Sequence, residues 1–340
     1  MTRHDRMMAF LHDHLTQDFH VETLAGDASF RRYHRIHFDL KSEQNHTHMT
    51  YLLMDAPPEK ESVVEFVKVA DILSERVNAP DIIARDMEQG FLLLQDYGTT
   101  EFAHVITNKD QKDAYYQQAL DTLVQLQKIQ IDVDLPLYDN DVLIREMNLF
   151  TQWFLPYVGV NGDFADGHVW QQLHQVLTQS IQSQPKVIVH RDYHSRNLMI
   201  DKSSGSLGVI DFQDALIGAD TYDLVSLVRD AYIDDDEDWV MTQITKFHSL
   251  SLRTDSLFEF VRDVNVMGVQ RHLKVLGIFV RLSQRDGKER YLANIPKVMK
   301  DLIHELTWLT QKDIHPIYGE FLGWLNTEVL PKYHHKFNVA

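Results

Sequence analysis

Three side chains near the middle of the chain have the types and the spacing that phosphoryl transfer requires. Asp192 ends a His-Arg-Asp sequence, Asn197 follows five residues later, and Asp211 stands directly after an apolar run. A carboxylate can accept the proton of an attacking hydroxyl group, while an amide oxygen and a second carboxylate can hold Mg²⁺ against phosphate oxygens. The pattern therefore predicts Asp192 as the base, with Asn197 and Asp211 as metal ligands.

Two short apolar runs predict the strands that position these residues. Residues 187–189 come just before the His-Arg-Asp sequence, and residues 207–210 lead directly to Asp211. We expect the two runs to form one hairpin, so that the loop side chains and the acid at its end reach a common centre. The alternative is that the three polar residues are turn formers and a buried, ion-paired Asp. Their order, spacing and flanking strands together favour the catalytic interpretation.

The periodicity of the remaining sequence divides the chain into two regions. Before Thr100, alternation of apolar and polar residues predicts strands at 30–40, 50–54, 82–84 and 91–94. A 3.6-residue spacing of apolar residues predicts helices at 3–15 and 61–76. Beyond Thr100 the spacing is mainly helical, over about 113–130, 140–155, 167–183, 219–232, 238–250, 254–284, 294–311 and 315–329. We predict an α+β, two-lobed fold, with a small β-rich N-lobe at residues 1–95 and a larger, mainly helical C-lobe at residues 96–340.

Two segments of the predicted N-lobe are candidates for binding ATP. The segment 26–29 lies between predicted strands, and its small residues would let backbone N–H groups approach phosphate oxygens, although an ordinary hairpin turn is the alternative. The run 91–94 ends in Gln-Asp-Tyr-Gly, whose backbone could offer the adenine edge a donor and an acceptor. The predicted ATP-binding residues are Gly26, Asp27, Ala28, Ser29, Arg31, Gln95 and Tyr97.

The composition bounds the partners of the protein. Asp and Glu number 50 against 33 Lys and Arg, so the formal net charge is −17 and the surface repels nucleic acid and anionic membranes. Cysteine is absent, which excludes disulfides and thiolate chemistry. The apolar runs are too short to span a bilayer, and the N-terminal residues lack the pattern of a signal peptide. We expect a cytoplasmic monomer that binds neither nucleic acid nor membranes.

The catalytic-loop sequence resembles that of the aminoglycoside phosphotransferase family, within the protein-kinase-like superfamily. Blocks beginning at Leu24, Leu53, Gln89 and Met267 resemble one branch of it, the bacterial anomeric kinases that act on N-acetylmuramate and N-acetylglucosamine in cell-wall recycling. The resemblance implies a protein-kinase-like fold with magnesium-bound ATP in the cleft and sugar 1-phosphates as products. It carries the roles of base and metal ligands over to Asp192, Asn197 and Asp211, and it implies that Asp223 braces the catalytic loop.

The sequence departs from the kinase-like pattern at two positions. Met54 stands where such folds usually place a strand Lys, so Arg31, Arg32 or Lys68 is expected to contact the α- and β-phosphates, with Glu65 as a possible partner. Gln213 replaces the usual Gly after Phe212, which we expect to make that turn less mobile.

Polar residues on predicted helices are candidates for binding the acceptor. Arg271 and His272 lie on the long apolar helix 254–284, and Glu146 lies on the helix 140–155. They could reach the sugar or the lactyl carboxylate of muramate, or they could form ion pairs along helix flanks. Two other functions stay open: an aminoglycoside antibiotic phosphotransferase, whose polycationic substrates suit the negative charge, and a non-catalytic nucleotide-binding pseudokinase, suggested by Met54.

Overall fold

The chain forms two compact units. The computed structural model describes residues 1–25, 30–38, 50–202 and 204–339. One unit comprises Met1–Ile129 and Arg196–Ala215, and the other comprises Gln130–Ser195 and Leu216–Ala340. Residues 96–129 and 196–215 thus group with the N-terminal elements, whereas the lobe boundary predicted from the sequence follows residue 95. The compact units do not define lobes, so the predicted lobe boundary stays a prediction.

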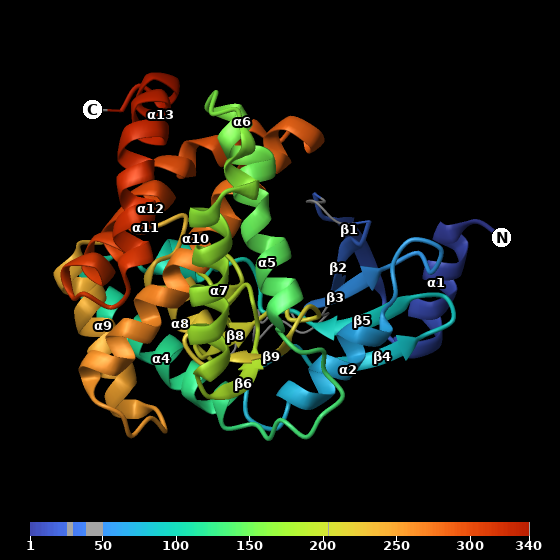
Figure 1. The fold of residues 1–340 in the computed structure, drawn as a ribbon. Coiled ribbons are helices and arrows are strands. Elements are labelled where there is room, and N and C mark those ends of the chain that lie inside the picture. Colours follow the sequence, from blue (N-terminus) through green and yellow to red (C-terminus); the bar gives the residue numbers. More distant parts are fainter. Residues whose placement is uncertain (26–29, 39–49, 203, 340) are drawn as a thin grey trace. The chain divides into compact units, whose positions relative to one another are not determined.

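A five-stranded antiparallel sheet is the centre of the first unit (Figure 1). Its strands, in spatial order, are β1 (Phe19–Thr23), β2 (Arg32–Phe38), β3 (Thr50–Asp55), β5 (Phe91–Gln95) and β4 (Ile82–Asp86). Because side chains alternate between faces, Ile36, Leu53 and Leu93 lie on one face, where Phe10 and Leu11 of helix α1 (Arg3–His14) cover them. Strand β1 was not predicted, because its alternation is short: Phe19 and Val21 are the two apolar residues of this five-residue edge strand.

Helices and a small hairpin complete the first unit. The helices are α2 (Val64–Leu73), α3 (Phe102–Val105) and α4 (Lys109–Gln127), and the hairpin pairs β7 (Leu198–Ile200) with β8 (Leu207–Val209). The hairpin that we predicted between residues 187–189 and 207–210 is therefore wrong. Four short apolar runs occur between residues 186 and 219, and their similar composition gives no indication of which pairs with which.

The second unit is mainly helical. Its elements are α5 (Asn140–Leu149), a π-helical turn (Phe150–Phe154), α6 (Leu155–Tyr157), α7 (His168–Ser183), α8 (Tyr222–Val228), α9 (Glu237–Leu250), α10 (Leu257–Asp286), α11 (Ile295–Gln311), α12 (Pro316–Trp324) and α13 (Leu330–Phe337). Strand β6 (Lys186–Val189) pairs antiparallel with β9 (Leu216–Ala219). Among the described residues, no helix is long and apolar enough to cross a membrane.

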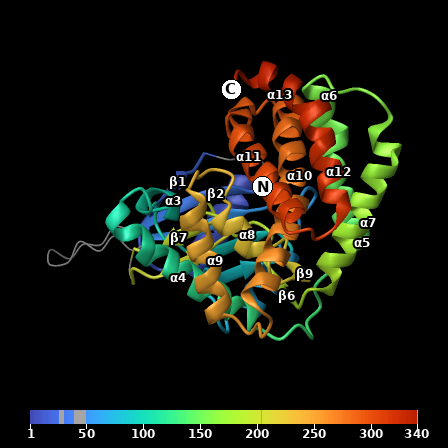
Figure 2. The same ribbon diagram turned by 60° about the vertical axis from the view of Figure 1, so that its left-hand side comes forward.

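Helix α10 is the core helix of the second unit, and α5, α7, α8 and α11 pack against it (Figure 2). A capping box between Ser256 and Glu259 begins the helix, and Gly287, with φ of 68°, ends it. Almost every side chain between Phe260 and Val280 is buried, including several charged ones. Buried charges require partners, so α10 must be surrounded by compensating groups.

Candidate active site

The predicted catalytic residues are divided between the two units. Asp192 belongs to the second unit, whereas Asn197 and Asp211 belong to the first. The loop that carries Asp192 and the turn that carries Asp211 are each held by contacts within their own unit. The predicted convergence of the three side chains on one metal–phosphate centre stays a prediction.

Three contacts to the backbone hold the loop of Asp192. The carboxylate of Asp223 accepts hydrogen bonds from the N–H groups of His190 and Arg191, at 2.6 and 3.0 Å. The guanidinium of Arg271 donates to the carbonyl oxygen of Arg191 at 3.1 Å. Arg191 has a φ of 76°, which is costly for a residue with a side chain and requires such support. These contacts agree with the bracing role that the family resemblance implies for Asp223.

The charge of Asp192 is stabilised by neighbouring cations. Burial would raise the pKa of its carboxyl group, but nearby charges, with Lys274 the largest and Arg271 among them, outweigh burial and hold the pKa below its ordinary value. Asp192 is therefore ionised at neutral pH and can accept a proton.

Glu146 joins the cations of this cluster. Its carboxylate accepts from Arg191 at 2.6 Å, from Lys274 at 3.1 Å and from the hydroxyl group of Tyr138. Lys274 also donates to the hydroxyl oxygen of Tyr222 at 2.8 Å. Burial opposes ionisation of Glu146, but Lys274 and Arg191 outweigh it and lower its pKa. The described contacts of Glu146 are therefore with the catalytic loop, α10 and Tyr138. The substrate contact predicted for Glu146 stays a prediction.

Arg271 and His272 lie on different faces of α10. Arg271 contacts the catalytic loop and the hydroxyl oxygen of Tyr222, at 3.1 Å for each. His272 faces α11, where its Nδ1 lies 2.8 Å from Glu305 Oε2. Burial lowers the pKa of His272 to about 3, so its ring is neutral at pH 7, and burial raises the pKa of Glu305 well above its ordinary value. The structure does not bring His272 to the Asp192 cluster, and the substrate contacts predicted for both residues stay predictions.

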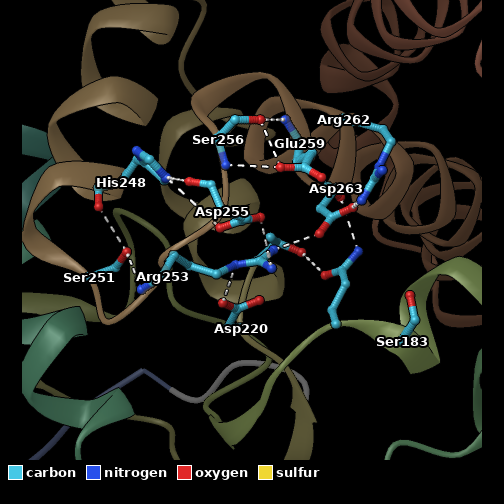
Figure 3. Close-up of polar contacts among 12 residues, drawn as sticks. Ser183, Asp220, His248, Ser251, Arg253, Asp255, Ser256, Glu259, Arg262 and Asp263 are labelled. Carbon is cyan, nitrogen blue, oxygen red and sulfur yellow. Dashed lines mark hydrogen bonds and ion pairs between the residues drawn. The ribbon is translucent and has the colours of Figure 1, made fainter.

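A second polar network fixes the segment that leads into α8 (Figure 3). Arg253, in the connection between α9 and α10, forms ion pairs with Asp220 at 2.9 Å and Asp263 at 2.6 Å. Burial raises the pKa of Asp220 to about 7, although Arg253 opposes this shift. Because Asp220 comes three residues before Asp223, this network positions the carboxylate that holds the catalytic loop.

The two predicted metal ligands contact each other within the first unit. Asn197 Nδ2 lies 3.4 Å from Asp211 Oδ2, and the backbone N–H of Ile210 donates to the carbonyl oxygen of Asn197 at 3.0 Å. Asp211 has a φ of 64°, and the next residue, Phe212, is fully buried with its ring 4.7 Å from that of Phe66 on α2. The hairpin β7–β8 and the anchored Phe212 thus bring the two side chains together.

These donor groups fit Mg²⁺. A carboxylate and an amide supply oxygen ligands, which Mg²⁺ prefers, and the ion needs few of them because it keeps several waters and binds phosphates. The carboxylate of Asp211 is exposed and forms no ion pair with Lys or Arg in the part of the chain that the structure describes. Its negative charge is therefore available to a cation.

Arg31 and the predicted metal ligand Asp211 both lie near Tyr33 in the first unit. The Nε of Arg31 is 2.6 Å from Glu61 Oε2, an ion pair that we did not predict, and the pairing suggested for Glu65 stays a prediction. Burial raises the pKa of the nearby Tyr33 to about 12, and the charges of both Arg31 and Asp211 act on that hydroxyl group. Met54 is fully buried on β3, in agreement with the absence of a cation there.

The segment after β5 is held by side chains of the same unit. Arg35 pairs with Asp96 at 2.6 Å, and the N–H of Gly98 donates to the same carboxylate at 2.9 Å. Tyr97 is buried with its ring against β8, where a Cβ on Gly208 would come within 2.5 Å of the ring. The backbone N–H of Gln95 donates to the backbone carbonyl oxygen of Asp81 at 2.9 Å. The adenine contacts predicted at Gln95 and Tyr97 stay predictions.

The segment Gly26-Asp27-Ala28-Ser29 lies outside the described residues. Its predicted role in covering the phosphates therefore also stays a prediction.

Comparison with known proteins identifies the family. Residues 20–256 match the phosphotransferase enzyme family. The chain belongs to this family. Two curated relatives are named N-acetylmuramate/N-acetylglucosamine kinase. The protein from Neisseria meningitidis serogroup B is 40% identical, over 84% of this chain and 85% of its own length. The protein from Pseudomonas putida is 41% identical, over 80% of this chain and 79% of its own length.

Solved structures share the fold. Choline kinase from Cryptosporidium parvum Iowa II has a TM-score of 0.59 at 11% identity, covering 95% of this chain and all of that one. The streptomycin–ATP–APH(2")-IIa ternary complex has a TM-score of 0.53 at 15% identity, covering 80% and 89%. At such low identities the structural similarity concerns the fold alone. It confirms the predicted α+β, protein-kinase-like fold. The family match and the curated relatives confirm an ATP-dependent small-molecule kinase.

Sequence reasoning missed two members of the site. Lys274 lies three residues after Arg271, hence on the same helical face, and a Lys inside an apolar helix was a signal that could have identified it. Glu61 gave no such signal, because it precedes the first residue of α2 and its direction depends on how that connection folds.

Proposed function

We propose that this protein transfers the γ-phosphate of ATP to the anomeric hydroxyl group of N-acetylmuramate and N-acetylglucosamine. The products are the sugar 1-phosphates of peptidoglycan recycling, made by a monomeric enzyme in the cytoplasm. The observation that carries the proposal is the identity of 40–41% to two kinases named for these sugars, over about four-fifths or more of both chains. A single aligned stretch of that extent includes the catalytic loop and the metal-ligand turn.

Asp192 acts as the base in this proposal. It accepts the proton of the anomeric hydroxyl group as the oxygen attacks the γ-phosphorus, and the bond between that phosphorus and the bridging oxygen of ADP breaks. The cations that keep Asp192 ionised also make it a weak base. A weak base suffices here, because a hemiacetal hydroxyl is more acidic than an ordinary alcohol.

Asn197 and Asp211 would hold the Mg²⁺ that accompanies ATP. When bound, the ion neutralises charge on the phosphate oxygens. Arg31 takes the place of the missing strand Lys and contacts the α- and β-phosphates, oriented by Glu61. The ion pair at 2.6 Å and the common influence of Arg31 and Asp211 on Tyr33 support this role.

Arg191 and Arg271 present positive charge beside the base. We propose that this charge favours the acceptor that carries a carboxylate, N-acetylmuramate, over N-acetylglucosamine. Arg191 is suited to such a contact because its side chain remains 24% exposed, whereas Lys274 is enclosed.

Phosphate transfer from radiolabelled ATP to a panel of acceptors tests the proposal. The panel contains N-acetylmuramate, N-acetylglucosamine and kanamycin, and the Asp192→Asn variant is the control for contaminating kinases. Label should enter both amino sugars and be absent from kanamycin. Transfer to kanamycin alone would establish the antibiotic kinase instead, and ATP binding without transfer to any acceptor would establish the pseudokinase.

A further inference from the structure

The side chain of Gln213 contacts the predicted metal ligand two residues before it. Gln213 Nε2 donates to Asp211 Oδ1 at 2.9 Å, a good hydrogen-bond distance, whereas Asn197 Nδ2 lies 3.4 Å from Oδ2. The two carboxylate oxygens of Asp211 are therefore held unequally. Oδ1 is fixed by Gln213, and Oδ2 accepts the longer hydrogen bond from Asn197.

The turn around Gln213 is fixed from both sides. Phe212 is fully buried against Phe66, and its carbonyl oxygen accepts from the N–H of Ala215 at 3.0 Å. The backbone is therefore anchored on either side of Gln213, within reach of Asp211. A Gly at this position would leave Asp211 without this donor.

The other end of the same amide points to a role beyond packing. Gln213 Oε1 is buried and has no hydrogen-bond partner among the described residues. Leaving a buried polar atom without a partner costs about 1–3 kcal/mol, so such an atom calls for an explanation. An acceptor beside a metal-binding carboxylate is suited to hydrogen-bond a water molecule of the hydrated ion.

We infer that Gln213 is the positioning residue of the metal site, fixing Asp211 Oδ1 so that Oδ2 faces Mg²⁺. The inference rests on the proposed function only in assigning Mg²⁺ to Asp211. Groups that orient a metal ligand commonly contribute roughly 10–100-fold to metal affinity. Removal of the Gln213 amide should therefore weaken metal binding by about 10-fold or more.

Binding of Mn²⁺ to the full chain, in the presence of ADP, tests the inference without any turnover. The signal of free Mn²⁺ in electron paramagnetic resonance gives the dissociation constant for the wild type and for Gln213→Met, which keeps the length of the side chain and removes its donors. The matched control is Gln117→Met, because Gln117 Nε2 donates to Asp121 Oδ1 at 3.1 Å on the exposed surface of α4.

Gln213→Met should weaken Mn²⁺ binding by about 10-fold or more and leave the metal-free affinity for ADP within twofold, while Gln117→Met changes neither. A Mn²⁺ affinity of Gln213→Met within twofold of the wild type would overturn the inference. An equal loss of metal-free ADP affinity would also overturn it, because Gln213 would then only maintain the fold. If the wild type transfers no phosphate to amino sugars but the Mn²⁺ result holds, only the proposed acceptor fails.

Discussion

Replacing Glu146 with Gln tests whether its buried charge stabilises the second unit. Glu146 is 6% exposed and joins Arg191 and Lys274, so Glu146→Gln leaves both cations without their carboxylate. Removing one partner of a buried pair costs roughly 3–5 kcal/mol. Because the side chain of Arg191 is 24% exposed and can turn to water, we expect a value at the lower end, about 3 kcal/mol.

A double-mutant cycle separates the ion pair from other effects. Lys274→Met alone leaves Glu146 paired with Arg191, so its cost should be about 1.5–3 kcal/mol, that of a hydrogen bond to a charged group. The double variant should cost less than the sum of the two by about 1–3 kcal/mol. The exposed Glu320 of α12 provides the control Glu320→Gln, with an effect within about 0.5 kcal/mol.

Urea unfolding followed by tryptophan fluorescence measures these changes selectively. All five tryptophans, including Trp170 on α7, belong to the second unit, as does Glu146. A cost of Glu146→Gln below about 0.5 kcal/mol would refute the reasoning. So would strict additivity in the cycle, since Glu146 and Lys274 would then not interact.

Three further predictions follow from individual residues. Asp192→Asn should lower kcat by roughly 10²-fold or more and leave ATP affinity near normal; wild-type turnover would exclude Asp192 as the base. Asp211→Ala should abolish magnesium-dependent ATP binding in calorimetry, and an unchanged affinity would exclude it as a metal ligand. Although burial opposes it, hydrogen bonds from His304 and Arg229 lower the pKa of Glu237 to about 2, from 4.5. The contribution of ionised Glu237 to the free energy of unfolding is thus complete above pH 4.5 and is lost as the pH falls toward 2. Between pH 4.5 and 2, the free energy of unfolding in urea should therefore fall more steeply for the wild type than for Glu237→Gln, and equal slopes against pH would contradict this.

The sequence was most informative where the type and spacing of residues indicate one function or one kind of element. The order and spacing of Asp192, Asn197 and Asp211 indicated a kinase, and the family comparison agrees. Helices such as α7 and α11 were placed to within one residue at each end, because their apolar stripes repeat at 3.6 residues.

The failures have a common physical origin in long-range pairing. Strand β6 pairs with β9 instead of β8, because short apolar runs carry no information on their partners. Arg31 forms an ion pair with Glu61, in the connection before α2, which the sequence did not single out. The cluster of Glu146 and Lys274 joins residues more than a hundred positions apart. Such pairs follow from the tertiary fold, and local periodicity does not encode them.

The position of phosphate on the product tests the central claim most directly. The full-length protein is incubated with N-acetylmuramate and magnesium-bound ATP, and phosphorus–carbon couplings in the NMR spectrum of the product locate the new ester. The account predicts phosphate on C1, formed by the wild type and absent with Asp192→Asn. Phosphate on any other carbon, or an unmodified sugar beside phosphorylated kanamycin, would contradict it.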